Sequence, residues 1–344
     1  MDNMKVAMYY SNNDVRIENQ KIPDITDNEI LVKVIASGIC GSDVMEWYRI
    51  KKAPLVLGHE ISGVVEKTGK NVSKFKKGDR VFVTHHVPCN TCYYCLNGEH
   101  TLCNTLHSTK FYPGGFAQYL RVPEINVDRG TFILPDEMSY DEGTFIEPLA
   151  CVVRGFRKAM FKPARSVLVL GSGVAGILNI KLARAYGASR IFATDLDSFR
   201  IDVAEKMGAD YCFNAKDDIS KKIKENNNGR LADFVILCAG VPSAIKQAIS
   251  CVEPGGTILW FAPTKPGVNV EFPFFDIWNR QIKMFSTYAG AGKDIIDAIE
   301  LLRSKVVNVN DMITHKFPMN KTPEAFKIAA DASKSIKIII EPQK

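Results

Sequence analysis

Four cysteines lie within fifteen residues of this chain, with the spacing C-x2-C-x2-C-x7-C: Cys89, Cys92, Cys95 and Cys103. A tetrahedral Zn²⁺ takes four thiolate ligands at ~2.3 Å, and one loop that folds back on itself can supply all of them. The spacing is not that of a C₂H₂ finger, and it lacks the C-x3-C-P ending of a bacterial iron–sulfur site. The alternative is four unrelated thiols, two of them disulfide-bonded. We therefore predict a closed structural zinc site, which holds a loop and does no chemistry.

The bulk composition is typical of a soluble globular protein. The chain has 344 residues, which favours two domains, and it is 46% hydrophobic and 24% charged. The net charge of +6 is dispersed, and the one basic cluster, Lys74, Lys76 and Lys77, lies in a polar turn, so we expect no nucleic-acid partner. The sequence has no long apolar stretch and no signal-like start, so we expect no membrane association and a cytoplasmic location.

The first 135 residues or so contain short strand-like runs separated by Gly, Pro and Asn, which predicts a compact, barrel-like β unit. The periodicity then changes. A helix is predicted from the capping residue Ser139 through Cys151. Beyond it, six apolar strands alternate with helices such as 174–186 and 198–207, which predicts a parallel, doubly wound α/β sheet. The strands are expected at 167–170, 191–194, 211–213, 234–237, 257–261 and 282–286.

A glycine-rich turn follows the first of these strands. Gly171, Gly173 and Gly176 form G-x-G-x-x-G directly before a predicted helix, with Ala175 in its first turn. Such glycines allow a pyrophosphate to approach the helix amino end, where free N–H groups and the dipole favour anions. Asp195 ends the next strand, where a carboxylate can accept from a ribose hydroxyl. Arg200 either covers the adenosine or lies on a solvated helix face.

Three further short motifs suit a second metal centre. They are Cys40–Asp43 after a strand, Gly58–Glu60 in a turn, and Glu147-Pro148 in the helix after the β unit. Each motif is weak alone. Together they supply a thiolate, an imidazole and two carboxylates, the mixed ligand set of a catalytic zinc with one exchangeable position.

These motifs, with the four-cysteine lobe and Gly114–Ala117, occur in the order found in one family, over nearly the full length. The chain resembles the zinc-dependent medium-chain alcohol/polyol dehydrogenases, and in particular the sorbitol/threonine dehydrogenase branch. The resemblance implies a GroES-like β-barrel catalytic domain (1–150), a Rossmann NAD-binding domain (151–286), and a C-terminal return to the catalytic domain (287–344). It also implies that Cys40, His59 and Glu60 bind the catalytic zinc, that Glu147 ligates the metal or its water, and that Asp43 orients His59.

The chain departs from the family pattern in places. Met45 stands where the family often has a relay histidine, and Thr287 stands about where the sorbitol branch has a substrate-binding Arg. Several aromatic side chains are expected to wall the substrate pocket, and Arg154 is the cation that could add an anion site there. These aromatic residues are Trp47, Tyr48, Phe111, Tyr112, Phe116 and Phe274.

The resemblance implies reversible NAD-dependent oxidation of a secondary alcohol, a polyol or a hydroxy-amino acid to a ketone, with two Zn²⁺ per chain. Ser42 would take the alcohol proton toward solvent. The partner would be a small alcohol, and the chain would form a homodimer or homotetramer. A different class of protein, a zinc-stabilised NAD-binding redox sensor without turnover, is the alternative, which the missing relay histidine permits.

Overall fold

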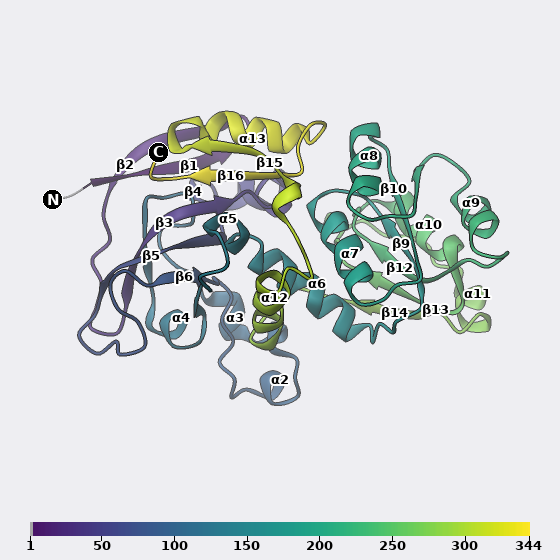
Figure 1. Cartoon of the computed structure of the whole chain (residues 1–344), viewed down its shortest axis with the longest axis horizontal. Coiled ribbons are helices and arrows are strands. Elements are labelled where there is room, and N and C mark those ends of the chain that lie inside the picture. Colours follow the sequence, from purple (N-terminus) through teal and green to yellow (C-terminus); the bar gives the residue numbers. More distant parts are fainter. Residues whose placement is uncertain (1–2) are drawn as a thin grey trace. The chain divides into compact units, whose positions relative to one another are not determined.

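A computed structural model describes residues 3–344 of the chain, which divide into two compact units. The first comprises Met1–Ala150 and Ala289–Lys344, and the second comprises Cys151–Tyr288. The chain therefore leaves the first unit once and returns to it (Figure 1). The first unit is mostly β and the second is a parallel α/β sheet, as the predicted fold class requires.

The first unit is built on two sheets. One has the strand order β15-β16-β3-β5-β6-β8, with β7 also paired to β3, and the other has the order β2-β1-β4. The strands are β1 Asn3–Ser11, β2 Asp14–Lys21, β3 Ile30–Gly38, β4 Leu55–Val56, β5 Glu60–Thr68, β6 Arg80–Val83, β7 Tyr119–Val122, β8 Thr131–Ile133, β15 Ile313–Pro318 and β16 Lys337–Glu341.

Short helices connect these strands. They are α1 Glu46–Arg49, α2 Tyr93–Leu96, α3 Asn104–Ser108, α4 Glu124–Arg129, α5 Tyr140–Gly143, α12 Lys293–Arg303 and α13 Thr322–Asp331. The last strand, β16, pairs antiparallel with β3, placing Ile339 opposite Gly38. The C-terminal segment, yellow in Figure 1, thus completes the sheet that the N-terminal strands begin. This pairing matters for the site, because Cys40 follows β3 directly.

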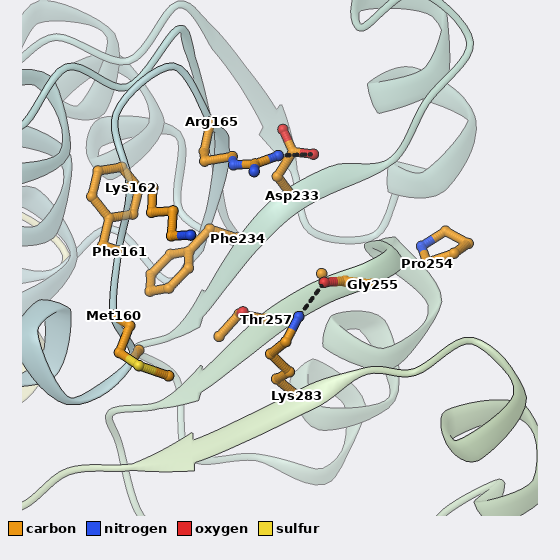
Figure 2. Close-up of a pocket in the computed structure, with 12 residues that line it drawn as sticks. Met160, Phe161, Lys162, Arg165, Asp233, Phe234, Pro254, Gly255, Thr257 and Lys283 are labelled. Atoms are coloured by element: carbon orange, nitrogen blue, oxygen red, sulfur yellow. Dashed lines mark hydrogen bonds and ion pairs between the residues drawn. The ribbon is translucent and has the colours of Figure 1, made fainter.

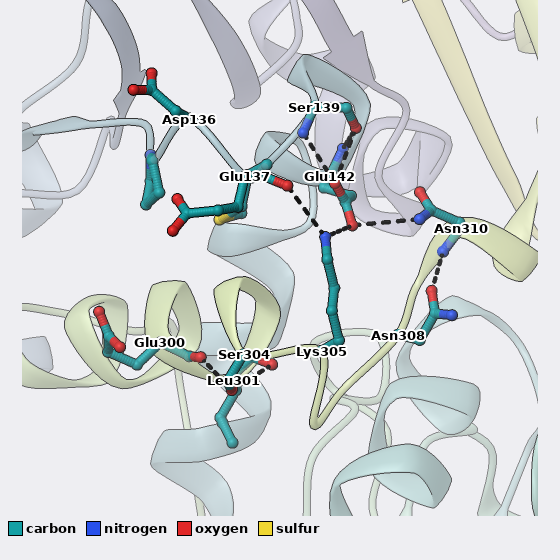
Figure 3. A network of polar contacts seen from close by, with 12 residues as sticks. Asp136, Glu137, Ser139, Glu142, Glu300, Leu301, Ser304, Lys305, Asn308 and Asn310 are labelled. Carbon is teal, nitrogen blue, oxygen red and sulfur yellow. Dashed lines mark hydrogen bonds and ion pairs between the residues drawn. The ribbon is translucent and has the colours of Figure 1, made fainter.

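A polar network fastens this returning segment to the start of α5 (Figure 3). Lys305 Nζ lies 2.5 Å from Glu142 Oε1, and Asn310 Nδ2 donates to the same oxygen at 3.2 Å. The other carboxylate oxygen of Glu142 accepts the Ser139 N–H at 2.9 Å. Glu142 is nearly buried, and each of its oxygens has a donor, so its burial is compensated.

The helix predicted from Ser139 through Cys151 is in fact two helices, so the expectation of one continuous helix was wrong. Ser139 caps α5, which ends at Gly143, and α6 begins anew and spans Ile146–Lys158. Pro148 explains the break, because it has no N–H to offer the carbonyl four residues earlier and its ring crowds that carbonyl. In the first turn of α6 this missing donor costs nothing.

The second unit is a six-stranded sheet in which every pairing is parallel, with the order β11-β10-β9-β12-β13-β14. All six predicted strands are present. The strands are β9 Ser166–Leu170, β10 Arg190–Asp195, β11 Tyr211–Asn214, β12 Ala232–Leu237, β13 Val252–Trp260 and β14 Lys283–Ser286. The helices are α7 Val174–Ala185, α8 Ser198–Lys206, α9 Ile219–Asn226, α10 Pro242–Cys251 and α11 Phe274–Asn279.

A cavity of about 260 Å³ lies at the amino ends of strands in the second unit (Figure 2). Phe161 and Phe234 line it with rings in edge-to-face contact. Arg165 and Lys283 also line it, and Lys283 donates to the Gly255 carbonyl at 2.9 Å. Ligands of parallel sheets bind at the carboxyl ends of the strands, so this cavity is not the dinucleotide site.

Candidate metal centre and cofactor site

The turn after β3 positions Cys40 and Ser42 through its own side chains. The Cys40 N–H donates to Asp43 Oδ2 at 3.1 Å, and the Ser42 N–H points at Cys40 Sγ at 3.4 Å. A 3₁₀ turn over Gly41–Asp43 results. The turn therefore stabilises its own backbone, which fixes the position of Cys40.

A second turn positions His59 at the start of β5. Gly58 has φ +91°, and a Cβ there would lie 2.8 Å from the Phe116 backbone nitrogen. The Gly115 N–H donates to the Gly58 carbonyl at 2.9 Å, and the Phe116 N–H donates to the Leu57 carbonyl at 3.0 Å. The Gly114–Ala117 motif thus supports the backbone of the His59 turn, and only glycine suits position 58.

These two turns bring Cys40, His59 and Glu60 together, with ligand atoms within 4.8 Å of one another. Asp43 Oδ1 lies 3.4 Å from His59 Nδ1, which leaves the other ring nitrogen for a metal. Burial opposes the charged form of each partner. The facing charges outweigh burial, so the pKa of His59 rises well above its usual value and the pKa of Asp43 falls below its usual value.

Glu60 provides the test of whether a cation fits this set. Its Oε2 forms an ion pair with Lys337 Nζ of β16, and both side chains are 0% exposed. Its Oε1 is buried without a hydrogen-bond partner among residues 3–344. A buried carboxylate oxygen with no donor carries a large desolvation cost. A divalent cation beside the Cys40 thiolate and the His59 imidazole would remove that cost, so the residues fit zinc.

Glu147, the other predicted carboxylate ligand, lies half-buried in the first turn of α6. It is not among the residues whose ligand atoms lie within 4.8 Å of one another. Its predicted role at the metal stays a prediction. Sequence reasoning missed three residues at this centre: Arg49, Lys337 and His85. Of the three, only Lys337 is unusual in the sequence, because it is a single cation at the start of the apolar run K-I-I-I.

His85 follows β6 and lies against the candidate metal centre. Its ring centroid is 4.9 Å from that of His59 and 3.7 Å from that of His86. Burial, followed by the neighbouring His86, His59 and Arg49, lowers the pKa of His85 well below its usual value. His85 is thus a neutral imidazole at neutral pH.

The four-cysteine lobe forms the second candidate centre. Cys89, Cys92, Cys95 and Cys103 all lie within 4.8 Å of one another, with neighbouring sulfur atoms 3.5–4.0 Å apart. Tetrahedral Zn–S bonds of ~2.3 Å place sulfurs ~3.8 Å apart. Donors from Thr91 and the Cys92 N–H lower the pKa of Cys89 to about 5, which favours the thiolate. None of the four is in a disulfide.

The glycine-rich turn in the second unit has the geometry of an anion site. Gly173 caps α7, and a Cβ on Gly176 would lie 2.0 Å from the Gly171 carbonyl oxygen, so no larger residue fits there. The Asp195 carboxylate ends β10 and accepts the Ser172 N–H at 2.8 Å and the Leu196 N–H at 2.8 Å. The acidic side chain is therefore fixed beside the turn.

Arg200 lies over the same turn. A methyl group placed on Gly173 would be 3.6 Å from Nη1 of Arg200. Of the two interpretations left open by the sequence, this geometry favours a position over the cofactor site, at the amino end of α7, where it can meet a phosphate or an adenosine.

Comparisons with known proteins agree with this geometry. Residues 26–129 match the profile of the alcohol dehydrogenase GroES-like domain, and residues 175–304 match that of the zinc-binding dehydrogenases. A sorbitol dehydrogenase of Bacillus subtilis is 31% identical over 99% of this chain and 98% of its own. The chain belongs to the zinc-dependent medium-chain dehydrogenase family.

Two further members of the family are close to this dehydrogenase. The Probable D-xylulose reductase A of Aspergillus clavatus is 35% identical over 95% of this chain and 93% of its own. A zinc-binding dehydrogenase from Sinorhizobium meliloti, solved with NADP, has a TM-score of 0.89 and 27% identity, covering 99% of this chain and 100% of its own. The predicted enzyme class is confirmed, as are zinc and NAD(P) as cofactors.

Part of the predicted aromatic wall of this dehydrogenase was wrong. Phe116 and Phe111 are core residues, and Phe116 packs against Phe326 with ring centroids 5.5 Å apart. Phe274 is 77% exposed on α11. Large aromatic side chains fill cores by default, and Phe111 and Phe116 follow that tendency. Over residues 3–344, no helix has the length and apolarity needed to span a bilayer.

We expect two zinc ions per chain with different roles. Cys40→Ser should remove about one zinc and cut turnover at least ~10³-fold while the thermal midpoint stays near that of the wild type. Cys92→Ser should remove the other zinc and impair folding, because structural zinc binding is worth about 10–16 kcal/mol in small model sites. Cys212→Ser is the matched control, because Cys212 lies in β11 and belongs to neither group of candidate zinc ligands. Elemental analysis finding a single zinc, lost with Cys40→Ser, would contradict the two-site assignment.

Proposed function

We propose that this dehydrogenase transfers hydride reversibly between NAD and a secondary alcohol or polyol, or a hydroxy-amino acid, interconverting alcohol and ketone. The observation that carries this proposal is the unpartnered Glu60 oxygen in the mixed donor set of Cys40, His59 and Glu60. The names of two relatives, a sorbitol dehydrogenase and a D-xylulose reductase, support a polyol substrate. A redox sensor has no use for an open metal position, which counts against that alternative.

Each residue of the centre has a role in this proposal. When bound, zinc supplies a Lewis acid for the alcohol oxygen and NAD accepts the hydride. Cys40, His59 and Glu60 would hold the metal, and Asp43 keeps the imidazole in the ligating orientation. The Ser42 hydroxyl would relay the proton that the alcohol loses. It would accept that proton while passing its own toward solvent, and the transfer would run in reverse when the ketone is reduced.

The two carboxylates would share one metal position. Four-coordinate zinc with Cys40, His59 and a substrate oxygen has room for one of them. Glu60 is held by Lys337 at one oxygen and Glu147 starts a separate helix, so the two can exchange without moving together. We propose that Glu147 and Glu60 compete for the metal as water leaves and substrate enters.

The direct test is NADH formation by the zinc-loaded protein across a panel of alcohols. Secondary alcohols and polyols should be oxidised. Ser42→Ala should lower kcat by about 10²- to 10⁴-fold, the usual contribution of a positioned proton acceptor. Glu147→Gln should lower turnover far more than metal content, whereas Glu124→Gln on α4 serves as a control that changes neither. Failure to oxidise any secondary alcohol would refute the proposed function, and full activity of Glu147→Gln would remove Glu147 from the mechanism.

Asp195 would set the choice of cofactor. A 2′-phosphate beside this carboxylate places like charges about 4 Å apart, a repulsion of roughly 4 kcal/mol at an effective dielectric near 20. Backbone donors hold Asp195 in place, so it cannot turn away freely. Arg200, whose guanidinium lies near Gly173, would attract phosphate in either cofactor.

NAD should therefore be preferred over NADP by about 10³-fold in kcat/KM, the factor that corresponds to this repulsion. Asp195→Gly should remove most of the preference by improving the use of NADP. Asp197→Asn, two residues away at the cap of α8, should leave the ratio nearly unchanged. Initial rates with both cofactors give the ratio, and equal use of NADP by the unmodified protein would refute the assignment.

The same unit carries a surface suited to a second copy of the chain. β14 is the end strand of the six-stranded sheet, so its outer edge is not covered by another strand of that sheet. The adjacent α11 exposes Phe274, Phe275 and Trp278, the last 67% accessible. Open edges and large apolar patches are normally covered in stable proteins. A two-fold axis would pair two β14 strands antiparallel and cover both patches.

We propose that the chain is at least a homodimer through β14 and α11. Replacement of Phe275 and Trp278 by Glu should shift the molar mass to that of a monomer at micromolar concentration in light scattering, because two buried charges cost several kcal/mol. Replacement of the exposed Tyr93 and Leu96 of the cysteine lobe by Glu is the matched control and should leave the mass unchanged. A monomeric wild type would contradict the proposal.

A further inference from the structure

Arg49, the last residue of α1, lies against the Ser42 hydroxyl. Its Nε donates to the Ser42 carbonyl at 2.8 Å and its Nη2 donates to Ser42 Oγ at 2.8 Å. The same Nη2 lies 3.4 Å from Asp43 Oδ1, and the guanidinium lies 4.7 Å from the centre of the Tyr48 ring. The side chain is 14% exposed. The contacts of Nε and Nη2 therefore hold the Arg49 guanidinium in a fixed position.

The third nitrogen of the Arg49 guanidinium, Nη1, has no hydrogen bond of this kind among residues 3–344. A guanidinium has five N–H donors, and Nε and Nη2 account for three of them. Nη1 carries the remaining two, and none of residues 3–344 provides a hydrogen-bond acceptor for it. It is also absent from the buried unpartnered polar atoms of the described chain, so it remains reachable by solvent. Two fixed donors thus point away from the protein groups that Arg49 already binds.

The contact between Arg49 and Ser42 links the two Nη1 donors to the oxygen of the alcohol that reacts. Ser42 is the hydroxyl that we expect the alcohol to contact, and Arg49 occupies only one of its two lone pairs. The planar fork binds two oxygen atoms side by side. With Ser42 Oγ on Nη2, an oxygen on Nη1 would be one carried by the carbon next to the reacting carbon of the substrate.

The local charges favour a neutral hydroxyl over a carboxylate at this position. Arg49 and Lys337 are cationic, whereas Cys40 as a thiolate, Asp43 and Glu60 are anionic. A divalent cation leaves these five groups with one surplus positive charge. Glu147, which we propose to exchange with Glu60 at the metal, cancels that charge before the oxyanion of the deprotonated alcohol binds. A further carboxylate would lack a counter-charge and would lie near Asp43, which already shares the charge of Arg49.

We propose that Arg49 is a substrate-binding residue that donates to the hydroxyl adjacent to the reacting carbinol, so that the enzyme selects vicinal diols over simple secondary alcohols. This inference rests on the proposed function and names its substrate class.

The test compares two substrates with one carbon skeleton, 2,3-butanediol and 2-butanol. The wild type should show kcat/KM about 10- to 100-fold higher for the preferred diol stereoisomer, the factor expected for a hydrogen bond to a charged donor. Arg49→Met should reduce this ratio to within about threefold, and Arg49→Lys should retain part of it. Lys52→Met is the matched control, because Lys52 lies over the same Tyr48 ring at 5.2 Å and has no contact with Ser42 among the described residues. Its ratio should equal that of the wild type.

A binding measurement separates this inference from the proposed function. Quenching of NADH fluorescence should show tighter binding of acetoin than of butanone to the wild type but not to Arg49→Met, even if no alcohol is turned over. Thermal denaturation checks that both Arg49 variants are folded. A wild-type ratio near one, or a ratio unchanged in Arg49→Met, would overturn the proposal. So would an Arg49-dependent preference for 2-hydroxybutyrate over the diol, which would make the site one for carboxylates.

Discussion

The candidate metal centre depends on one buried ion pair, between Glu60 of β5 and Lys337 of β16. Both side chains are fully buried, and 277 residues separate them in the sequence. Removing one partner from such a pair is strongly destabilising, because the other charge remains uncompensated. The pair also limits what Glu60 can do. One carboxylate oxygen is committed to Lys337, and the other is left for a cation.

The topology explains how this pair arises. β3 lies between β5 and β16 in the sheet, and Cys40 follows β3 directly. The C-terminal segment must therefore return to the first unit before the site is complete, and the Lys305–Glu142 contact helps to hold it there. Strands far apart in the sequence supply the anionic and cationic parts of one centre. The glycine-rich turn, by contrast, needs only two consecutive strands and the helix between them.

The sequence was informative where chemistry is local. The four cysteines lie on one loop and the glycines of the dinucleotide turn lie within six residues, so spacing alone predicted that they meet. The meeting of Cys40, His59 and Glu60 was predicted from the resemblance to the family. Pairings set by the tertiary fold could not be predicted that way. The buried position of Lys337 beside Glu60 follows only from the pairing of β16 with β3, and the contact of Arg49 with Ser42 is seen only in the folded chain. The helix break at Pro148 was predictable in principle, because its rule is local, but the cap at Ser139 masked it.

The central claim is that the alcohol binds at the Cys40, His59 and Glu60 centre. Replacing zinc there with Co²⁺ gives visible absorption that responds to the ligands of the metal, and the all-cysteine centre has no exchangeable position to respond. Adding a secondary alcohol to the cobalt protein in the presence of NAD should change this spectrum, and Cys40→Ser should abolish the change. NADH formation with a spectrum that stays constant on alcohol addition would contradict the central claim.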